Sequence, residues 1–161
     1  MRKRFLLAIG AAALAAVAFG GIVLATPASL VTNTTIAAGN LGPVNLNIKT
    51  GDWKLDLRTK GDSNVIVTES RVSPGGDFGW HSHPGPSLVV VKSGTLSFYR
   101  GDDPTCTAEI YLAGDAFIDP GGVVHIGRNE GSVDLVVDTT RLVPAGAAPR
   151  IDEPDPGNCP F

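Results

Sequence analysis

Three histidines are the residues of this 161-residue chain best suited to chemistry, and the chain has no others. His81 and His83 stand two residues apart, so in an extended strand both imidazoles project from one face of the sheet. His125 follows a second Gly/Pro turn. Because imidazole is the commonest side-chain ligand of transition metals, this set predicts a mononuclear metal site. The alternative is that the rings are buried residues satisfied by hydrogen bonds.

The histidines lie among segments of strand character. Between residues 44 and 141, short runs rich in Val, Ile, Thr and aromatics are separated by Gly/Pro turns, and none of these runs has helical period. Trp53, Leu55 and Leu57 alternate with polar residues, as in a half-buried strand. Short strands at near-regular spacing predict an antiparallel sandwich or barrel.

The first 28 residues have the pattern of a secretory signal peptide. Basic residues at positions 2–4 precede an apolar run, and small residues allow cleavage after Ala25 or after Ala28. An uncleaved membrane anchor is the alternative, since about 20 apolar residues also span a bilayer. The start RKRFLL also approaches a twin-arginine signal, which would export the protein folded and already metallated. In each case we expect an exported protein: secreted, periplasmic or in the cell envelope.

Three further parts follow this leader. Residues 29–43 are small and polar, which is typical of a linker or an edge strand. Residues 44–141 form the predicted barrel. Residues 142–161 contain five prolines and therefore cannot form a central strand. This tail is either disordered or strapped across the barrel.

The two cysteines favour the strapped arrangement. Cys106 and Cys159 are an even count in a chain that we expect to be exported, so a disulfide between them is predicted. The bond would join the tail to the loop that contains Cys106. Two free thiols, or a metal-ligand role for either, are the alternatives.

The charge of the chain excludes some partners. The formal net charge is −3, and loss of the leader leaves 10 of the 13 basic residues against all 16 acidic ones, a net charge of −6. No basic stripe remains to bind nucleic acid or an anionic membrane surface. We therefore expect a small-molecule ligand or substrate as partner, and no membrane contact beyond an N-terminal anchor.

The spacing around the histidines resembles the two motifs of the cupin superfamily. The matching positions are Gly75, His81, His83, Ser87 and Gly94 in the first motif, and Gly114, Pro120, Gly122, His125 and Asn129 in the second. The resemblance implies an all-β, cupin-type jelly-roll barrel, also called a double-stranded β-helix. It also implies one divalent metal bound by the three histidines, and it leaves room for a homodimer, because cupins often pair through edge strands.

Ser87 departs from the family pattern, because most metal-binding cupins carry a glutamate ligand there. A serine hydroxyl is a poor neutral donor, so the expected ligands are three neutral imidazoles with open positions beside them. Some cupins that oxidise thiols similarly use three histidines. Such a site suits Zn, Cu, Fe, Ni, Co or Mn, and its uncompensated dipositive charge favours anionic ligands.

Weaker candidates for the pocket or for contacts behind the ligands lie close to the histidines. They are Ser87, Trp80, Asp77, Asp119, Phe117 and Tyr99. The aromatic residues are equally typical of a barrel core, and both aspartates adjoin Gly or Pro, which is typical of turns. Arg100 and Arg128 are candidates for an anionic substrate, or else solvated strand ends.

Two classes of function remain open. The first is a metalloenzyme, most plausibly a dioxygenase-like oxidoreductase acting on a small molecule at an open metal position. The second is a non-catalytic barrel that binds a metal or ligand. A pocket open beside the histidines favours the enzyme, whereas a pocket filled by Trp80, Phe117 or the tail favours binding.

Overall fold

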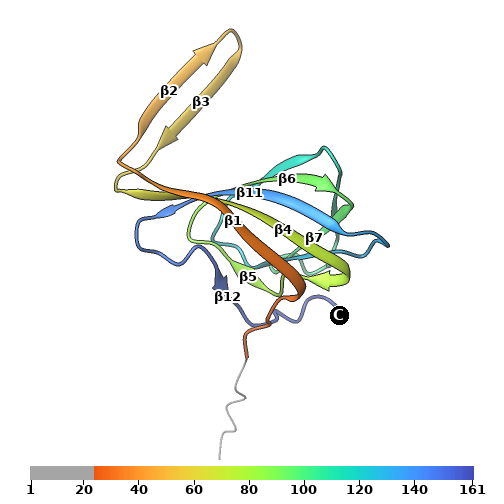
Figure 1. The fold of residues 1–161 in the computed structure, drawn as a ribbon. Coiled ribbons are helices and arrows are strands. Elements are labelled where there is room, and N and C mark those ends of the chain that lie inside the picture. Colours follow the sequence, from red (N-terminus) through yellow and green to blue (C-terminus); the bar gives the residue numbers. More distant parts are fainter. Residues whose placement is uncertain (1–23) are drawn as a thin grey trace, which may run out of the picture.

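The computed structural model describes residues 24–161, which contain strands and no helix (Figure 1). The predicted leader, residues 1–28, falls largely outside this range. The strands are β1 (Ser29–Leu41), β2 (Asn45–Thr50), β3 (Trp53–Arg58), β4 (Ser63–Asp77), β5 (His81–Ser82), β6 (Ser87–Ser93), β7 (Thr95–Arg100), β8 (Glu109–Leu112), β9 (Ala116–Asp119), β10 (His125–Arg128), β11 (Leu135–Pro144) and β12 (Ile151–Asp152). Within the described range, no helix is available that could cross a bilayer.

Ten of these strands form one antiparallel sheet that curls into a nearly closed barrel. The strand order is β12-β5-β10-β4-β11-β6-β9, with β1 beside β4 and with β7 joining β10 to β8. Neighbours in this order are often far apart in the sequence, as in a jelly roll. The predicted all-β, cupin-type jelly-roll barrel is confirmed.

Strand β1 resolves the two alternatives for residues 29–43. It pairs with β4 along its length, from Ser29 opposite Asp77 to Leu41 opposite Ser63. It has no second strand neighbour within the described chain. This segment is therefore an edge strand.

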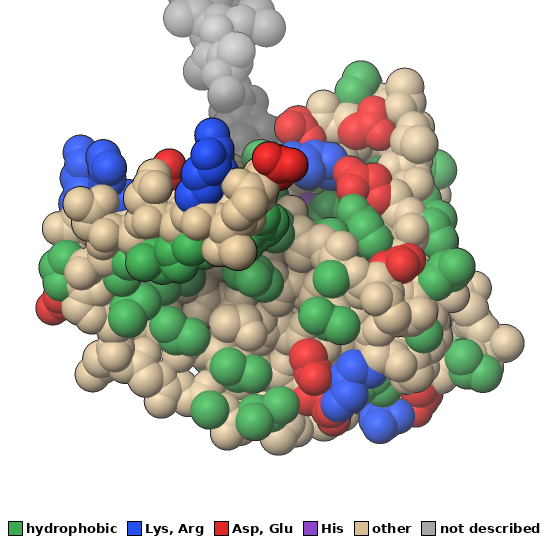
Figure 2. Space-filling model, turned by 90° about the horizontal axis from the view of Figure 1, so that it is seen from above, with side chains coloured by type: hydrophobic (Ala, Val, Ile, Leu, Met, Phe, Trp, Pro, Cys, Tyr) green, Lys and Arg blue, Asp and Glu red, His purple; other side chains and the backbone are tan. Residues whose placement is uncertain are grey.

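The hairpin of β2 and β3 departs from the predicted barrel limits, because it forms a separate two-stranded sheet that projects from the barrel (Figure 1). Leu46 opposes Leu57 and Ile48 opposes Leu55, so one hairpin face is apolar. The exposed fractions of Leu46, Ile48 and Leu55 are each 38%. Figure 2, which looks down on this end of the molecule, shows hydrophobic side chains uncovered there.

The barrel core follows from strand alternation. In β6, Val89 and Val91 are buried, whereas Leu88 and Val90 face outward and are about half exposed. Ser87 shares the inward side and is 1% exposed. The core is completed by residues from several strands, namely Val72, Leu96, Phe98, Leu135 and Val137. The interior near one end of β6 is thus polar, and near the other end apolar.

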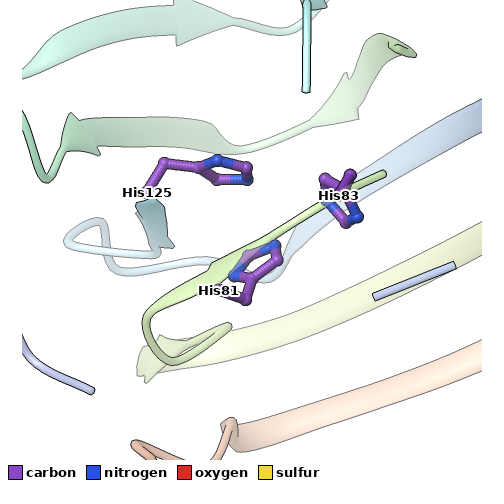
Figure 3. A group of neighbouring side chains, drawn as sticks. All are labelled: His81, His83 and His125. Carbon is purple, nitrogen blue, oxygen red and sulfur yellow. The ribbon is translucent and has the colours of Figure 1, made fainter. Parts of the chain in front are cut away.

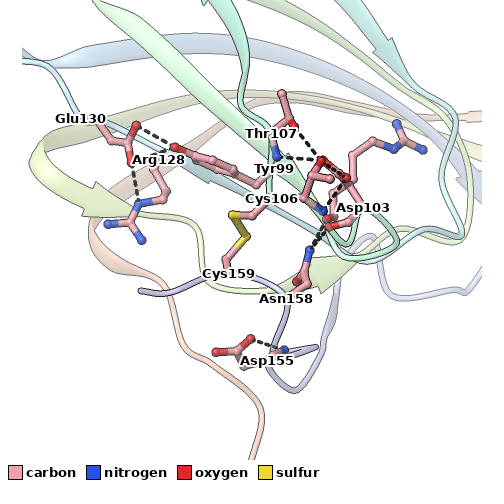
Figure 4. The surroundings of a disulfide bond; sticks show 12 residues. Tyr99, Asp103, Cys106, Thr107, Arg128, Glu130, Asp155, Asn158 and Cys159 are labelled. Carbon is pink, nitrogen blue, oxygen red and sulfur yellow. Dashed lines mark hydrogen bonds and ion pairs between the residues drawn. A yellow bond between two sulfur atoms is a disulfide. The ribbon is translucent and has the colours of Figure 1, made fainter.

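The C-terminal tail is fixed to the outside of the barrel. Cys106 and Cys159 form a disulfide, as predicted, and Cys159 packs against Trp80, Tyr99 and Ile126 (Figure 4). Strand β12, within the tail, pairs with β5. The final barrel strand, β11, continues to Pro144, three residues beyond the predicted boundary at 141. The tail therefore lies directly beside the strand that carries His81.

Candidate metal centre

The barrel brings the three histidines together. His81 begins β5, His83 follows this strand, and His125 begins β10 directly opposite His81. Their ligand atoms all lie within 4.8 Å of one another, and each residue is no more than 5% exposed. Figure 3 shows the three rings projecting toward a common space. Residues more than 40 positions apart are thus positioned to bind one metal ion.

Backbone carbonyls set the orientation of each ring. The Nδ1 atoms of His81, His83 and His125 lie 2.8, 2.7 and 2.9 Å from the carbonyl oxygens of Gly79, Pro149 and Val123. Because a carbonyl oxygen only accepts hydrogen bonds, we assign the proton to each Nδ1. The neutral rings then present their unprotonated Nε2 atoms. This is the arrangement that supports a metal-bound imidazole.

Burial keeps the rings neutral. Loss of hydration lowers the pKa of His83 to about 4, and it also lowers the pKa values of His81 and His125. At neutral pH the three rings therefore hold no proton that a metal would need to displace.

The same shifts predict acid sensitivity of the metal-free protein. Unfolded histidines bind protons below pH about 6.5, while the folded rings resist them, so the free energy of unfolding decreases as the pH falls from about 6.5 toward 4. We expect His83 alone to contribute a loss of about 2 kcal/mol between pH 7 and pH 5. Chemical denaturation of chelator-treated protein measures this loss, and His83→Gln should reduce it. Equal stability at both pH values would contradict the account.

A small cavity of about 50 Å³ adjoins the histidines. Apolar side chains form part of its wall, namely Phe78, Val89, Leu96, Phe98, Phe117 and Val137. Polar side chains form the rest, namely Ser70, Ser87, Asp119, Thr139 and Arg141 together with the histidines. The volume admits a few water molecules or a small ligand.

Two of the polar residues face each other across neighbouring strands. Ser87 in β6 pairs in register with Asp119 in β9. Asp119 Oδ2 lies 3.9 Å from His83 Nε2 and 3.8 Å from His125 Nε2. Neither Ser87 Oγ nor Asp119 Oδ2 has a hydrogen-bond partner. Both atoms are buried, so these unsatisfied groups are aimed at the same small space.

Comparison with known families agrees with this arrangement. A family model described as a cupin domain matches residues 68–141, which contain both histidine motifs. Residues 68–141 belong to the cupin superfamily. This cupin retains all three histidine positions of the family motifs and lacks the glutamate of the first one.

Relatives of this cupin match only part of it. Auxin-binding protein ABP19a of Prunus persica is 31% identical over 95 residues, and ABP19b of the same species is 33% identical over 95 residues. Each match covers 58% of this chain and 41% of the relative, so the chain spans about two-fifths of their length. The crystal structure of a cupin-like protein from Thermotoga maritima has a TM-score of 0.49 and 25% identity, covering 56% of this chain and 65% of the other.

Three of the weaker candidates do not line the cavity, which corrects the expectation drawn from their proximity in the sequence. Trp80 directly precedes His81, and Tyr99 directly follows Phe98, so strand alternation turns both away from the interior. Tyr99 instead donates a hydrogen bond to Glu130 (Figure 4). Asp77 accepts hydrogen bonds from Ser29 and from the Gly79 amide, which is the turn role.

Arg141 is the charged cavity residue that sequence analysis missed. Arg100 and Arg128, the arginines considered there, pair with Asp102 and Glu130 and do not line the cavity. Arg141 lies in β11 on the same side as Val137 and Thr139, which both line the cavity. This two-residue period in LVVDTTR was the available signal.

Both ends of the described chain secure the histidine strand. The backbone of Trp80 donates to Thr26 Oγ1 at 2.7 Å and accepts from the Glu153 amide at 3.0 Å. The carbonyl that orients His83 belongs to Pro149, also in the tail. The tail therefore contributes directly to the geometry of the site.

Proposed function

We propose that this protein is exported, binds one divalent transition metal through His81, His83 and His125, and oxidises a small anionic molecule with dioxygen. The observation that carries the proposal is the shared cavity, where three neutral Nε2 atoms and the half-buried Arg141 guanidinium meet. A bound metal would supply positive charge and, if redox-active, single-electron chemistry. Export is supported by the disulfide, since such bonds persist in oxidising compartments.

Arg141 supports an anionic substrate. Its Nη1 donates to Thr68 Oγ1 at 3.0 Å, but its buried Nε has no partner. Within the described chain no carboxylate oxygen forms an ion pair with this guanidinium, and burial lowers its pKa while the charge of Asp119 opposes that fall. A half-buried cation without a hydrogen-bonded carboxylate is only partly compensated, whereas a substrate carboxylate would satisfy it with charge-assisted hydrogen bonds. We therefore assign the anionic end of the substrate to Arg141.

The aromatic wall supports exclusion of water. Phe98 stacks on His125 with ring centroids 4.9 Å apart, and Phe98 also contacts Phe117 edge to face. These rings fix the orientation of His125 and leave little room for bulk solvent. A small, partly apolar anion is the substrate class that fits.

Substitution of Arg141 tests this assignment. Arg141→Gln should weaken binding of a small carboxylate such as acetate by about 10- to 150-fold, the range expected when one charged hydrogen bond is lost. The metal content should not change. Calorimetric titration of metal-loaded protein measures the affinity, with the surface variant Arg100→Gln as control. Equal affinities for wild type and Arg141→Gln would refute the anion assignment.

A non-catalytic metal- or ligand-binding barrel is the second candidate, and the small cavity favours it. Oxygen consumption separates the two functions. Oxygen consumption should be measured with an oxygen electrode for protein loaded with Fe²⁺, Cu²⁺, Mn²⁺ or Zn²⁺, after small carboxylates, thiols or enols are added. The enzyme predicts uptake that depends on both metal and substrate. Ligand binding without uptake for every metal would establish the second candidate.

A further inference from the structure

Ser87, which stands where most metal-binding cupins carry a glutamate, lies directly opposite an aspartate, Asp119. Ser87 lies in β6 and Asp119 in β9. Given the proposed three-histidine metal site, on which this step rests, we infer that Asp119 is the fourth protein ligand. The carboxylate would then come from the strand next to the usual one, with Oδ2 3.9 Å from His83 Nε2 and 3.8 Å from His125 Nε2.

The strand pairing makes this exchange feasible. Side chains directly opposite each other in an antiparallel pair have Cβ atoms about 4.5–5.5 Å apart on the same face of the sheet. Ser87 and Asp119 are 1% and 4% exposed, and both line the cavity beside the histidines. A serine at 87 leaves room that a glutamate would occupy, so the aspartate at 119 has access to the centre.

The two oxygens of Asp119 have different surroundings. Oδ1 accepts a hydrogen bond from the Gly121 amide at 3.1 Å, which anchors the carboxylate in the turn after β9. Gly121 has φ +82°, and a Cβ there would lie 2.6 Å from the Gly85 carbonyl oxygen and 3.0 Å from that of His83. The turn is therefore packed tightly against the His83 segment. Oδ2, which has no hydrogen-bond partner, faces His83 and His125.

The imidazole nitrogens and the carboxylate oxygen at this point all accept hydrogen bonds, and the Ser87 hydroxyl makes no hydrogen bond to any of them. Because each Nδ1 carries the ring proton, His83 and His125 have no hydrogen on Nε2 to donate to Asp119 Oδ2, at 3.9 and 3.8 Å. A buried carboxylate oxygen without a donor is costly. Lone pairs of imidazole and carboxylate that converge without a proton are satisfied by a cation, and both are ordinary ligands of divalent transition metals.

This fourth ligand changes the charge of the site. Three imidazoles leave a divalent ion with its full double charge, whereas an added carboxylate reduces the net charge to one. An oxygen donor also favours Zn, Mn and Fe over a soft ion such as Cu(I). The remaining positive charge, next to Arg141, still attracts an anionic ligand.

Metal affinity of the full-length protein tests the assignment. Zn²⁺ affinity should be measured by chelator competition, and the ligand set by the Co²⁺ absorption spectrum, for wild type and Asp119→Asn. We expect Asp119→Asn to lose more than about 100-fold in affinity, beyond the roughly 10–100-fold cost of losing a group behind the ligands. The Co²⁺ spectrum should also change. Ser87→Glu added to Asp119→Asn should recover the affinity by returning the carboxylate to β6.

The matched control is Asp115→Asn, which alters an exposed aspartate in the turn before β9. It should keep the wild-type affinity and spectrum. If His125→Ala loses metal while Asp119→Asn matches wild type, the histidine site stands and the fourth ligand is refuted. A loss of only about 10-fold in metal affinity, with an unchanged Co²⁺ spectrum, would mean that Asp119 only positions the ligands, and this too would refute the fourth ligand. Wild-type protein without affinity for either metal would overturn the histidine site itself.

Discussion

Replacing His125 with alanine is expected to abolish stoichiometric metal binding. His81 and His83 both come from the segment around β5, whereas His125 is the histidine supplied by β10. Its loss leaves two imidazoles on one side of the site and opens the opposite side to water. We expect an affinity loss larger than the roughly 10–100-fold that follows removal of a group behind the ligands. Elemental analysis of the purified variant measures the effect, and His81→Ala should behave similarly.

The control for this experiment lies on the same strand. Arg128, at the end of β10, pairs with Glu130 and does not line the cavity, so Arg128→Ala should retain metal. Both variants should show the wild-type far-ultraviolet circular dichroism spectrum, since neither substitution removes a strand pairing. Equal metal occupancy in wild type, His81→Ala and His125→Ala would rule out the proposed ligands.

Removal of the disulfide is expected to cause the largest loss of stability. The bond between Cys106 and Cys159 spans 53 residues, and the entropy of closing such a loop corresponds to about 4 kcal/mol. Cys159→Ser also places a hydroxyl group in the buried cluster where Cys159 packs against Trp80 and Tyr99. Chemical denaturation should therefore give a free energy of unfolding about 4 kcal/mol below that of oxidised wild type.

Reduction of the wild type supplies the matched control. A reducing agent should lower the stability of the wild type to that of Cys159→Ser and leave the variant unchanged. Metal affinity should fall as well, because the Pro149 carbonyl that orients His83 lies in the released tail. A loss below about 1 kcal/mol would mean that the tail docks without help from the bond.

Local spacing was sufficient to predict that the three histidines lie close together. The interval between His81 and His83 places both rings on one face whatever the rest of the fold, and the two motifs indicated how His125 joins them. The disulfide was also predictable, because a chain with two cysteines has only one intramolecular pairing and export was expected. The short strands and Gly/Pro turns predicted an antiparallel sandwich or barrel, and the resemblance to cupins implied the barrel.

The register between strands and the position of each strand in the fold were harder to predict from the sequence. Asp119 was seen beside Pro120, in a turn, but its alignment with Ser87 depends on how β6 and β9 pair across the barrel. Similarly, alternation in residues 44–58 predicted strands that have an apolar face. It did not say what covers that face, and these strands project from the barrel as a separate hairpin.

Alternation along a strand also divides immediate neighbours of site residues. Trp80 and Tyr99 adjoin His81 and Phe98 in sequence, yet they pack with Cys159 in a separate cluster that does not line the cavity. Arg141 is distant from both histidine motifs in sequence, yet it lines the cavity. Proximity in sequence was therefore a poor guide to the pocket, and the two-residue period was a better one.

Metal content of the protein isolated from its native source, in the exported fraction where we propose that it lies, tests the central claim most directly, because recombinant expression in the cytoplasm changes the available metals. Mass spectrometric elemental analysis should find one equivalent of a divalent transition metal per chain. Zinc, copper, iron, nickel, cobalt or manganese would each satisfy the three-histidine site. Protein that is folded and disulfide-bonded but carries no such metal, and takes none up when it is supplied, would contradict the account.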